Sequence, residues 1–115
     1  MDSPSPSEWS KIRFLITKLR LCSLEENPEN IKIRKIILLE YYYRLHKKSK
    51  NPEMHFFNIP ELKEIDNEII TVNAIYLIDE NFVRGGVDIE GEQRFPWIAR
   101  ILPKGIAFIE DIITN

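Results

Sequence analysis

The chain has 115 residues, of which 43% are hydrophobic and 30% are charged. This length and composition fit one compact domain and exclude a large multidomain enzyme. The lone cysteine, Cys22, excludes an intrachain disulfide and a cysteine-rich zinc site, and it favours a reducing compartment. No apolar run approaches the roughly 18 to 20 residues of a membrane span, and the N-terminus lacks a basic start followed by an apolar stretch. We therefore expect a soluble, cytoplasmic protein without a membrane partner.

The net charge of −2 combines two halves of opposite sign. Residues 1–50 hold eleven Lys and Arg against six Asp and Glu, whereas residues 51–115 hold five against twelve. The first half therefore carries +5 and the second −7. An asymmetry of this kind guides encounters with a nucleic acid or a protein partner, and charged, solvated helix faces account for it equally well.

The N-terminal part predicts a tail followed by a helix. Residues 1–7 are rich in proline and serine and have nothing to bury, so we expect them to be disordered. Between residues 8 and 24, apolar side chains recur at i, i+3, i+4 and i+7, which is the spacing of one face of an amphipathic helix. That stripe consists of Ile12, Leu15, Ile16 and Leu19.

A long helix is expected next. Pro28 keeps the preceding residue away from helical angles, so the helix should start at Glu29 or Asn30 and run to Lys48. Its apolar residues fall on every side, as expected of the central helix in a domain that covers residues 29–115.

Two short elements and a third helix follow. The apolar segment 54–57 predicts a short strand, and Asn58, two residues before a proline, predicts the N-cap of a short helix over residues 59–65. The Asp-Asn pair that follows is expected to cap a helix over about residues 68–81. The buried stripe of this third helix is Ile70, Ala74, Leu77 and Ile78.

The C-terminal part predicts a hairpin and a closing helix. Residues 82–89 and 94–101 are rich in β-forming side chains and are joined by a glycine-containing loop. The Gly85-Gly86 pair permits a bulge, and Pro96 indicates that its strand has a free edge. A proline just after the second strand suits the first turn of a last helix. The apolar stripe of that helix is Ile106, Ile109 and Ile113.

The order of these elements, from the long helix to the hairpin and the closing helix, is that of a winged helix-turn-helix. Residues 72–83, VNAIYLIDENFV, are similar to the point where the recognition helix of that superfamily runs into the first wing strand. Residues 101–110, ILPKGIAFIE, resemble the passage from the second wing strand into the last helix in small prokaryotic, transcription-regulator-like members. The resemblance covers about residues 31–113. It implies an α+β fold, namely a winged helix-turn-helix with an extra N-terminal helix and a C-terminal helix.

Two positions depart from the pattern of the superfamily. Asn81 stands where a glycine usually follows the recognition helix, although asparagine also tolerates left-handed backbone angles. Leu102 stands where Ser or Thr often caps the last helix, so that cap has to come from elsewhere or is missing.

Winged helices include DNA readers, RNA readers and protein-interaction modules, so the surface residues have to decide between these functions. In the DNA-binding members the third helix enters the major groove. Its side chains with amides or hydroxyls that pair with bases are Asn67, Thr71, Asn73 and Tyr76. Side chains suited to phosphates are Arg84, Gln93, Arg94 and Arg100 on the hairpin, and Lys47, Lys48 and Lys50 after the long helix. The leading prediction is a dimeric, transcription-regulator-like protein that binds double-stranded DNA.

The charge of the third helix favours a different partner. Between Glu61 and Glu80 there are six acids and a single base, Lys63, so phosphates are repelled. Cross-strand ion pairs with the nearby acids would explain the hairpin arginines without DNA. The alternative is therefore a winged-helix protein-interaction module that binds a basic protein partner, and a binder of RNA or of a single strand is a third interpretation. The expected protein-binding surface is Glu68, Ile69, Val72, Tyr76 and Asp79.

The first and last helices lie outside the minimal winged core and are the expected contacts of a homodimer with twofold symmetry. Catalysis is not expected, because no glycine-rich phosphate loop, nucleophile elbow, HExxH or paired-cysteine motif is present. Cys22, His46 and His55 have no spacing that would assemble a catalytic or metal site. We therefore expect no cofactor and no metal.

Overall fold

The computed structural model describes residues 27–114. The expected tail over residues 1–7 and the expected helix over residues 8–24 lie outside the described residues, as does Cys22. The chain divides into two compact units after Ile31, and the contacts described below lie within the second unit.

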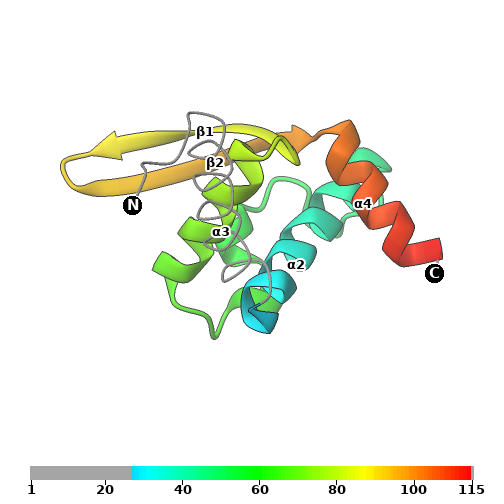
Figure 1. Cartoon of the computed structure of the whole chain (residues 1–115), viewed down its shortest axis with the longest axis horizontal. Coiled ribbons are helices and arrows are strands. Elements are labelled where there is room, and N and C mark those ends of the chain that lie inside the picture. Colours follow the sequence, from blue (N-terminus) through cyan, green and yellow to red (C-terminus); the bar gives the residue numbers. More distant parts are fainter. Residues whose placement is uncertain (1–26, 115) are drawn as a thin grey trace, which may run out of the picture. The chain divides into compact units, whose positions relative to one another are not determined.

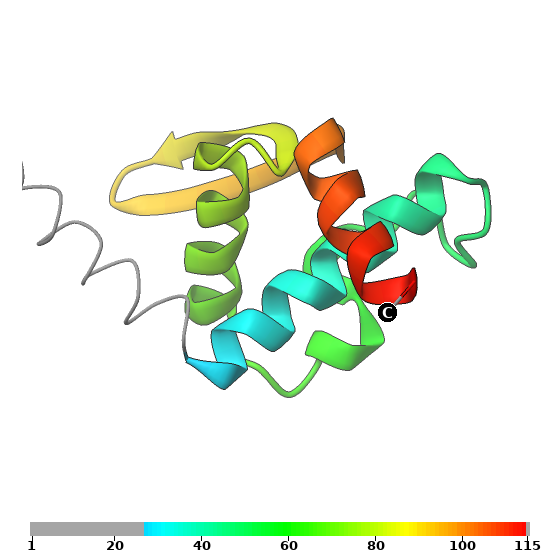
Figure 2. The same ribbon diagram turned by 45° about the vertical axis from the view of Figure 1, so that its right-hand side comes forward.

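The described residues form an α+β fold in which three α-helices accompany a two-stranded antiparallel sheet (Figure 1). In chain order the elements are helix α2 (Pro28–Leu45), the 3-10 turns η1 (Phe56–Asn58) and η2 (Pro60–Leu62), helix α3 (Asn67–Asp79), strands β1 (Val83–Glu90) and β2 (Gln93–Ile101), and helix α4 (Pro103–Thr114). The hairpin of β1 and β2 lies alongside α3 and extends beyond it, as Figures 1 and 2 both show. None of the helices in the described range combines the length and the apolar character of a membrane span.

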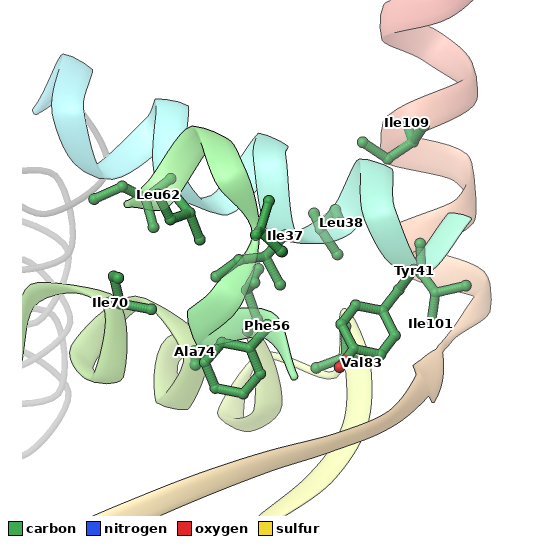
Figure 3. Packing of buried hydrophobic residues seen from close by; sticks show 13 residues of the cluster. Ile37, Leu38, Tyr41, Phe56, Leu62, Ile70, Ala74, Val83, Ile101 and Ile109 are labelled. Atoms are coloured by element: carbon green, nitrogen blue, oxygen red, sulfur yellow. The ribbon is translucent and has the colours of Figure 1, made fainter. Parts of the chain in front are cut away.

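One hydrophobic cluster draws side chains from all of these elements (Figure 3). Its buried members are Ile33, Ile37, Leu38, Tyr41, Phe56, Ile59, Leu62, Ile70, Ala74, Leu77, Val83, Ile101 and Ile109. The expected stripe of α3 is confirmed for Ile70, Ala74 and Leu77, whereas Ile78 is only half-buried. In α4 the stripe is buried at Ile109 but exposed at Ile113, because the last turn of that helix runs past the core.

Helix α2 ends in a residue with left-handed backbone angles. Lys47 has a φ of 57°, and the N–H of Lys48 donates to the carbonyl of Tyr43 at 2.8 Å. This closure is the Schellman motif, and it ends α2 at Leu45 rather than at the expected Lys48. Lys47, Lys48 and Lys50 therefore lie in the loop after the helix and not on its last turn.

Hydrogen bonds between residues close in sequence define both ends of helix α3. Oδ1 of Asp66 accepts the N–H of Glu68 at 2.9 Å, which confirms the expected cap. At the other end Asn81 has a φ of 62°, and the N–H of Phe82 donates to the carbonyl of Leu77 at 2.9 Å. The asparagine thus takes the left-handed position that glycine usually fills.

The segment between α2 and α3 differs from the expectation. Residues 54–57 form no strand, and the helix expected over residues 59–65 is reduced to the single turn η2. His55 explains the first difference, because its Nδ1 accepts the backbone N–H two residues ahead at 3.3 Å and holds the chain in turn η1. The second turn is capped by Ile59, which has no side-chain acceptor, and not by the expected Asn58.

The hairpin is tighter than the sequence predicts. Glu90 lies opposite Gln93, so the turn holds two residues instead of the expected loop of four. Gly91 in this turn has a φ of 62°, which glycine adopts without strain. The sheet contains two strands, so each strand has one unpaired edge, as Pro96 indicates for β2.

One register shift interrupts the strand pairing. Arg84 lies opposite Arg100, but the next residue of β1 lies opposite Ile98, so Ala99 is an extra residue in β2. Strict alternation would put the side chains of Ile98 and Ile101 on opposite faces of the strand. Because of this bulge both face the core, while Arg84 and Arg100 both face solvent.

Gly85 makes the bulge possible. A Cβ at this position would overlap the carbonyl oxygen of Trp97 on the opposite strand, so only glycine lets the two backbones approach. Gly86 is different, because a Cβ there would meet the indole ring of Trp97, 2.8 Å from Cζ2. A side chain can move out of the way more easily than a backbone carbonyl.

We expect Gly85→Ala to lower the free energy of unfolding by about 1–3 kcal/mol, because the backbone of β2 has to shift. Gly86→Ala is the matched control and should cost less than about 1 kcal/mol, since the indole is able to rotate away. Urea denaturation of both variants measures the difference. Equal losses would show that the close approach at Gly85 does not constrain the hairpin.

Candidate functional site

The four residues of α3 expected to pair with bases do not share one surface. Asn67 is exposed at the start of the helix, whereas Thr71 and Asn73 are buried. The burial of Asn73 contradicts its expected contact with DNA. Its Nδ2 donates to the carbonyl of Ile69 at 2.9 Å, and its Oδ1 accepts from Nε of Arg34 at 2.9 Å. The Asn73 side chain therefore connects α3 to α2.

Arg34 of α2 is a structural residue that the sequence analysis does not single out. It is only 7% exposed, and its Cζ lies 3.7 Å from the centroid of the Tyr76 ring. This cation–π contact occupies one face of the ring and leaves Tyr76 half-buried. The sequence does hold a signal for the burial of Arg34. This arginine directly follows Ile33 on an apolar helix and lies within one turn of Ile37.

The residues expected to contact phosphates on the hairpin are exposed. Arg84, Gln93 and Arg94 lie on the surface, as does Arg100. The cross-strand ion pairs proposed from the sequence do not form, because within residues 27–114 no carboxylate lies within 4.0 Å of any of these three arginines. Arg84 instead lies directly opposite Arg100.

A groove of about 510 Å³ lies between the start of α3 and the tip of the hairpin. It is lined by Phe57, Asn67, Glu68, Thr71, Glu92, Gln93, Arg94 and Phe95. Four of the residues expected to bind DNA meet here, two from α3 and two from the hairpin. Arg94 is outnumbered by the carboxylates of Glu68 and Glu92, so the groove is acidic and disfavours a phosphate.

The three lysines after α2 are separate from this groove. Lys47, Lys48 and Lys50 are exposed, and Lys50 borders a different hollow together with residues 51–54. The residues expected to bind DNA therefore lie on three elements: helix α3, the hairpin and this loop.

The surface expected to bind a protein is only partly available. Glu68, Ile69 and Asp79 are exposed, whereas Val72 and Tyr76 are half-buried. Helix α3 contains no Lys or Arg, so it presents carboxylates and one exposed isoleucine to solvent. Such a surface favours a basic protein over a phosphate backbone.

The two histidines take part in packing. The ring of His55 stacks on that of Phe57, with centroids 5.1 Å apart. Burial lowers the pKa of His55, and a hydrogen bond to the backbone of Pro96 opposes this shift. The ring of His46 packs edge-on against Tyr42. In the described part of the chain no group of three or more His, Cys, Asp or Glu side chains is placed to hold a metal ion.

Comparison of the chain with models of protein families, with curated proteins and with solved structures gives no match. Support for a function therefore comes from the hairpin and α3 themselves. The hairpin carries exposed arginines that have no carboxylate partner among residues 27–114, and α3 carries exposed carboxylates without a neighbouring base on the same helix.

We expect Asn73→Ala to lower the free energy of unfolding by about 1.5–3 kcal/mol, because the guanidinium of Arg34 loses a buried acceptor. Asn67→Ala removes an exposed amide from the same helix and should change this free energy by less than about 0.5 kcal/mol. Chemical denaturation of both variants measures the effect. If the two losses were the same, the bond between α2 and α3 would not be a main support of the fold.

Proposed function

We propose that this chain is a winged helix-turn-helix domain that binds double-stranded DNA chiefly through its hairpin. Support comes from the order of the elements, because α2, the turns η1 and η2, α3, the hairpin and α4 follow one another as the helices and wing of that superfamily do. The two 3-10 turns stand in place of the second helix. In this proposal the hairpin is the wing and α3 is the recognition helix.

The Arg84 and Arg100 pair is the observation that carries the proposal. Like charges directly opposite one another destabilise a sheet, and no carboxylate in the described residues lies within 4.0 Å to offset the repulsion. A phosphate between the two guanidinium groups would remove it, since the planar donors of arginine match phosphate oxygens. A pair that is unfavourable in the free protein thus becomes favourable on a DNA backbone.

The proposal assigns affinity and specificity to different elements. Arg94 adds an exposed cation nearer the hairpin tip, and Lys47 and Lys48 add two more in the loop after α2. Such contacts position a protein on DNA without reading its sequence. Because α3 has no cation and Asn73 is buried, base contacts are few, and affinity should depend strongly on salt.

We expect the double variant Arg84→Ala, Arg100→Ala to bind a short random-sequence duplex about tenfold more weakly or worse at low salt. The slope of log affinity against log salt should also fall by about 2, because two phosphate contacts are lost. Fluorescence anisotropy of the labelled duplex over a salt series measures both quantities.

The matched control is Lys32→Ala, Lys35→Ala, which removes the same charge from exposed positions on α2. It should reduce affinity less than twofold and leave the salt slope nearly unchanged. The proposal would be overturned by an absence of duplex binding at low salt. An equal loss in both double variants would also overturn it, since the effect would then be that of net charge alone.

Protein interaction through α3 is the second candidate, and the acidic character of that helix favours it. Glu68 and Asp79 are exposed around Ile69, and no basic side chain on the helix neutralises them. A basic protein segment would complement this face. The homodimer expected from the sequence has a separate candidate surface on α4. Its exposed apolar side chains are Phe108, Ile112 and Ile113.

Neutralising the acids of α3 distinguishes the two candidates. If α3 faces DNA as proposed, Glu68→Gln with Asp79→Asn should raise duplex affinity about threefold to tenfold, because two repelled carboxylates are removed. Glu53→Gln with Glu110→Gln, at exposed positions outside α3, should raise it less than twofold. The same anisotropy assay measures both. An unchanged affinity in the α3 variant would place α3 away from DNA and favour the protein partner.

A further inference from the structure

Two large aromatic side chains are exposed on one face of the hairpin. Phe95 is 43% exposed and Trp97 is 44% exposed, while Pro96 between them is buried. Side chains alternate between the two faces of a strand, so both rings project from the side opposite Pro96. Arg84 and Arg100 project from this same side. Phe95, near the tip, also borders the groove beside the start of α3. We call these four residues the outer face of the hairpin.

The spacing of the two rings suits nucleic-acid bases. Residues two apart on a strand are separated by about 6.4–6.8 Å, and aromatic side chains at such positions on a sheet act as stacking platforms for unpaired bases. In a duplex the faces of the bases are covered by their neighbours. Rings placed in this way therefore have partners in a single strand that an intact duplex does not offer.

Trp97 is supported by the backbone across from it. Gly86 lies opposite Trp97, and a Cβ at Gly86 would lie 3.0 Å from Cε2 and 3.1 Å from Nε1 of the indole. The ring thus occupies the space that any other residue at position 86 would fill. The absent side chain lets the indole lie across β1, and a large fraction of Trp97 still remains open to solvent.

The arginine pair stands beside this platform. Arg84 is two residues from Gly86 on β1 and shares its face, so the cross-strand pair of Arg84 and Arg100 is the next outward-facing pair after Gly86 and Trp97 along the hairpin. Two acids share this face: Asp88 lies directly opposite Phe95, and Glu90 lies at the tip opposite Gln93. Phosphates are therefore favoured at the base of the hairpin, next to Trp97, and disfavoured near the tip.

We propose that the outer face of the hairpin binds single-stranded DNA, with bases stacked on Trp97 and Phe95 and a phosphate held by Arg84 and Arg100. The inference rests on the proposed function, because the same arginines serve both. It goes beyond that function, because it makes unpaired bases the preferred ligand of the wing. Three features meet here: two exposed rings at alternate positions, a supporting glycine, and an arginine pair that has no carboxylate partner among residues 27–114.

The experiment compares oligothymidine with a duplex of equal length, using the full chain in a Trp9→Phe background so that Trp97 is the remaining tryptophan. We expect oligothymidine to quench Trp97 fluorescence and to bind more tightly than the duplex. Trp97→Leu should weaken oligothymidine binding about tenfold, which is within the range for loss of one stacked base, and should change duplex binding less than twofold.

Two further variants test the geometry. Gly86→Ala keeps the tryptophan but displaces its ring, so it should weaken oligothymidine binding in the same direction as Trp97→Leu. Phe108→Leu removes an exposed aromatic ring from α4 and should leave oligothymidine binding unchanged. Circular dichroism and thermal melting confirm that each variant is folded before binding is compared.

The outcomes separate this inference from the proposed function. The single-strand proposal is overturned if oligothymidine is not preferred over the duplex, or if Trp97→Leu does not weaken oligothymidine binding. The proposed function still stands in either case, provided that duplex binding depends on Arg84 and Arg100. If neither ligand binds at low salt, both fail, and the outer face of the hairpin becomes a candidate for a protein partner.

Discussion

The bulge at Ala99 is the constraint on which the hairpin and its surface depend. A strand without the extra residue would place Ile101 in solvent and the charge of Arg100 against the core. The bulge in turn depends on Gly85, because no other residue allows the carbonyl of Trp97 so close to β1. A single backbone irregularity therefore closes the core and aligns the two arginines on the opposite face.

A second constraint shapes α3. Arg34 and Asn73 satisfy one another between α2 and α3, and the guanidinium also covers one face of Tyr76. This contact buries Asn73 and leaves Tyr76 half-buried, and both of these side chains were expected from the sequence to pair with bases. What is left outward on α3 is mainly acidic, so an attraction for nucleic acid has to come from the hairpin.

The sequence predicts the elements that have several agreeing signals and fails where a single side chain decides the backbone. The apolar stripe and the Asp66 cap predict α3, and the β-forming residues on either side of a glycine-containing loop predict β1 and β2. The strand expected over residues 54–57 is wrong, because the side chain of His55 stabilises a turn there. The polarity of Asn73 suggests an exposed side chain, but Asn73 lies three residues after Ile70 and falls on the buried stripe. The exposure of Phe95 and Trp97 does not follow from the sequence, because aromatic residues in a strand are as readily buried as exposed.

Pro96 has a consequence for how the molecule meets copies of itself. A two-stranded sheet exposes unpaired backbone groups along both edges, and such edges attract further strands. Pro96 has no N–H to donate to an added strand. An incoming strand would thus find no donor at that point. The edge of β2 therefore disfavours the addition of a further strand, while the hairpin displays two large exposed aromatic rings.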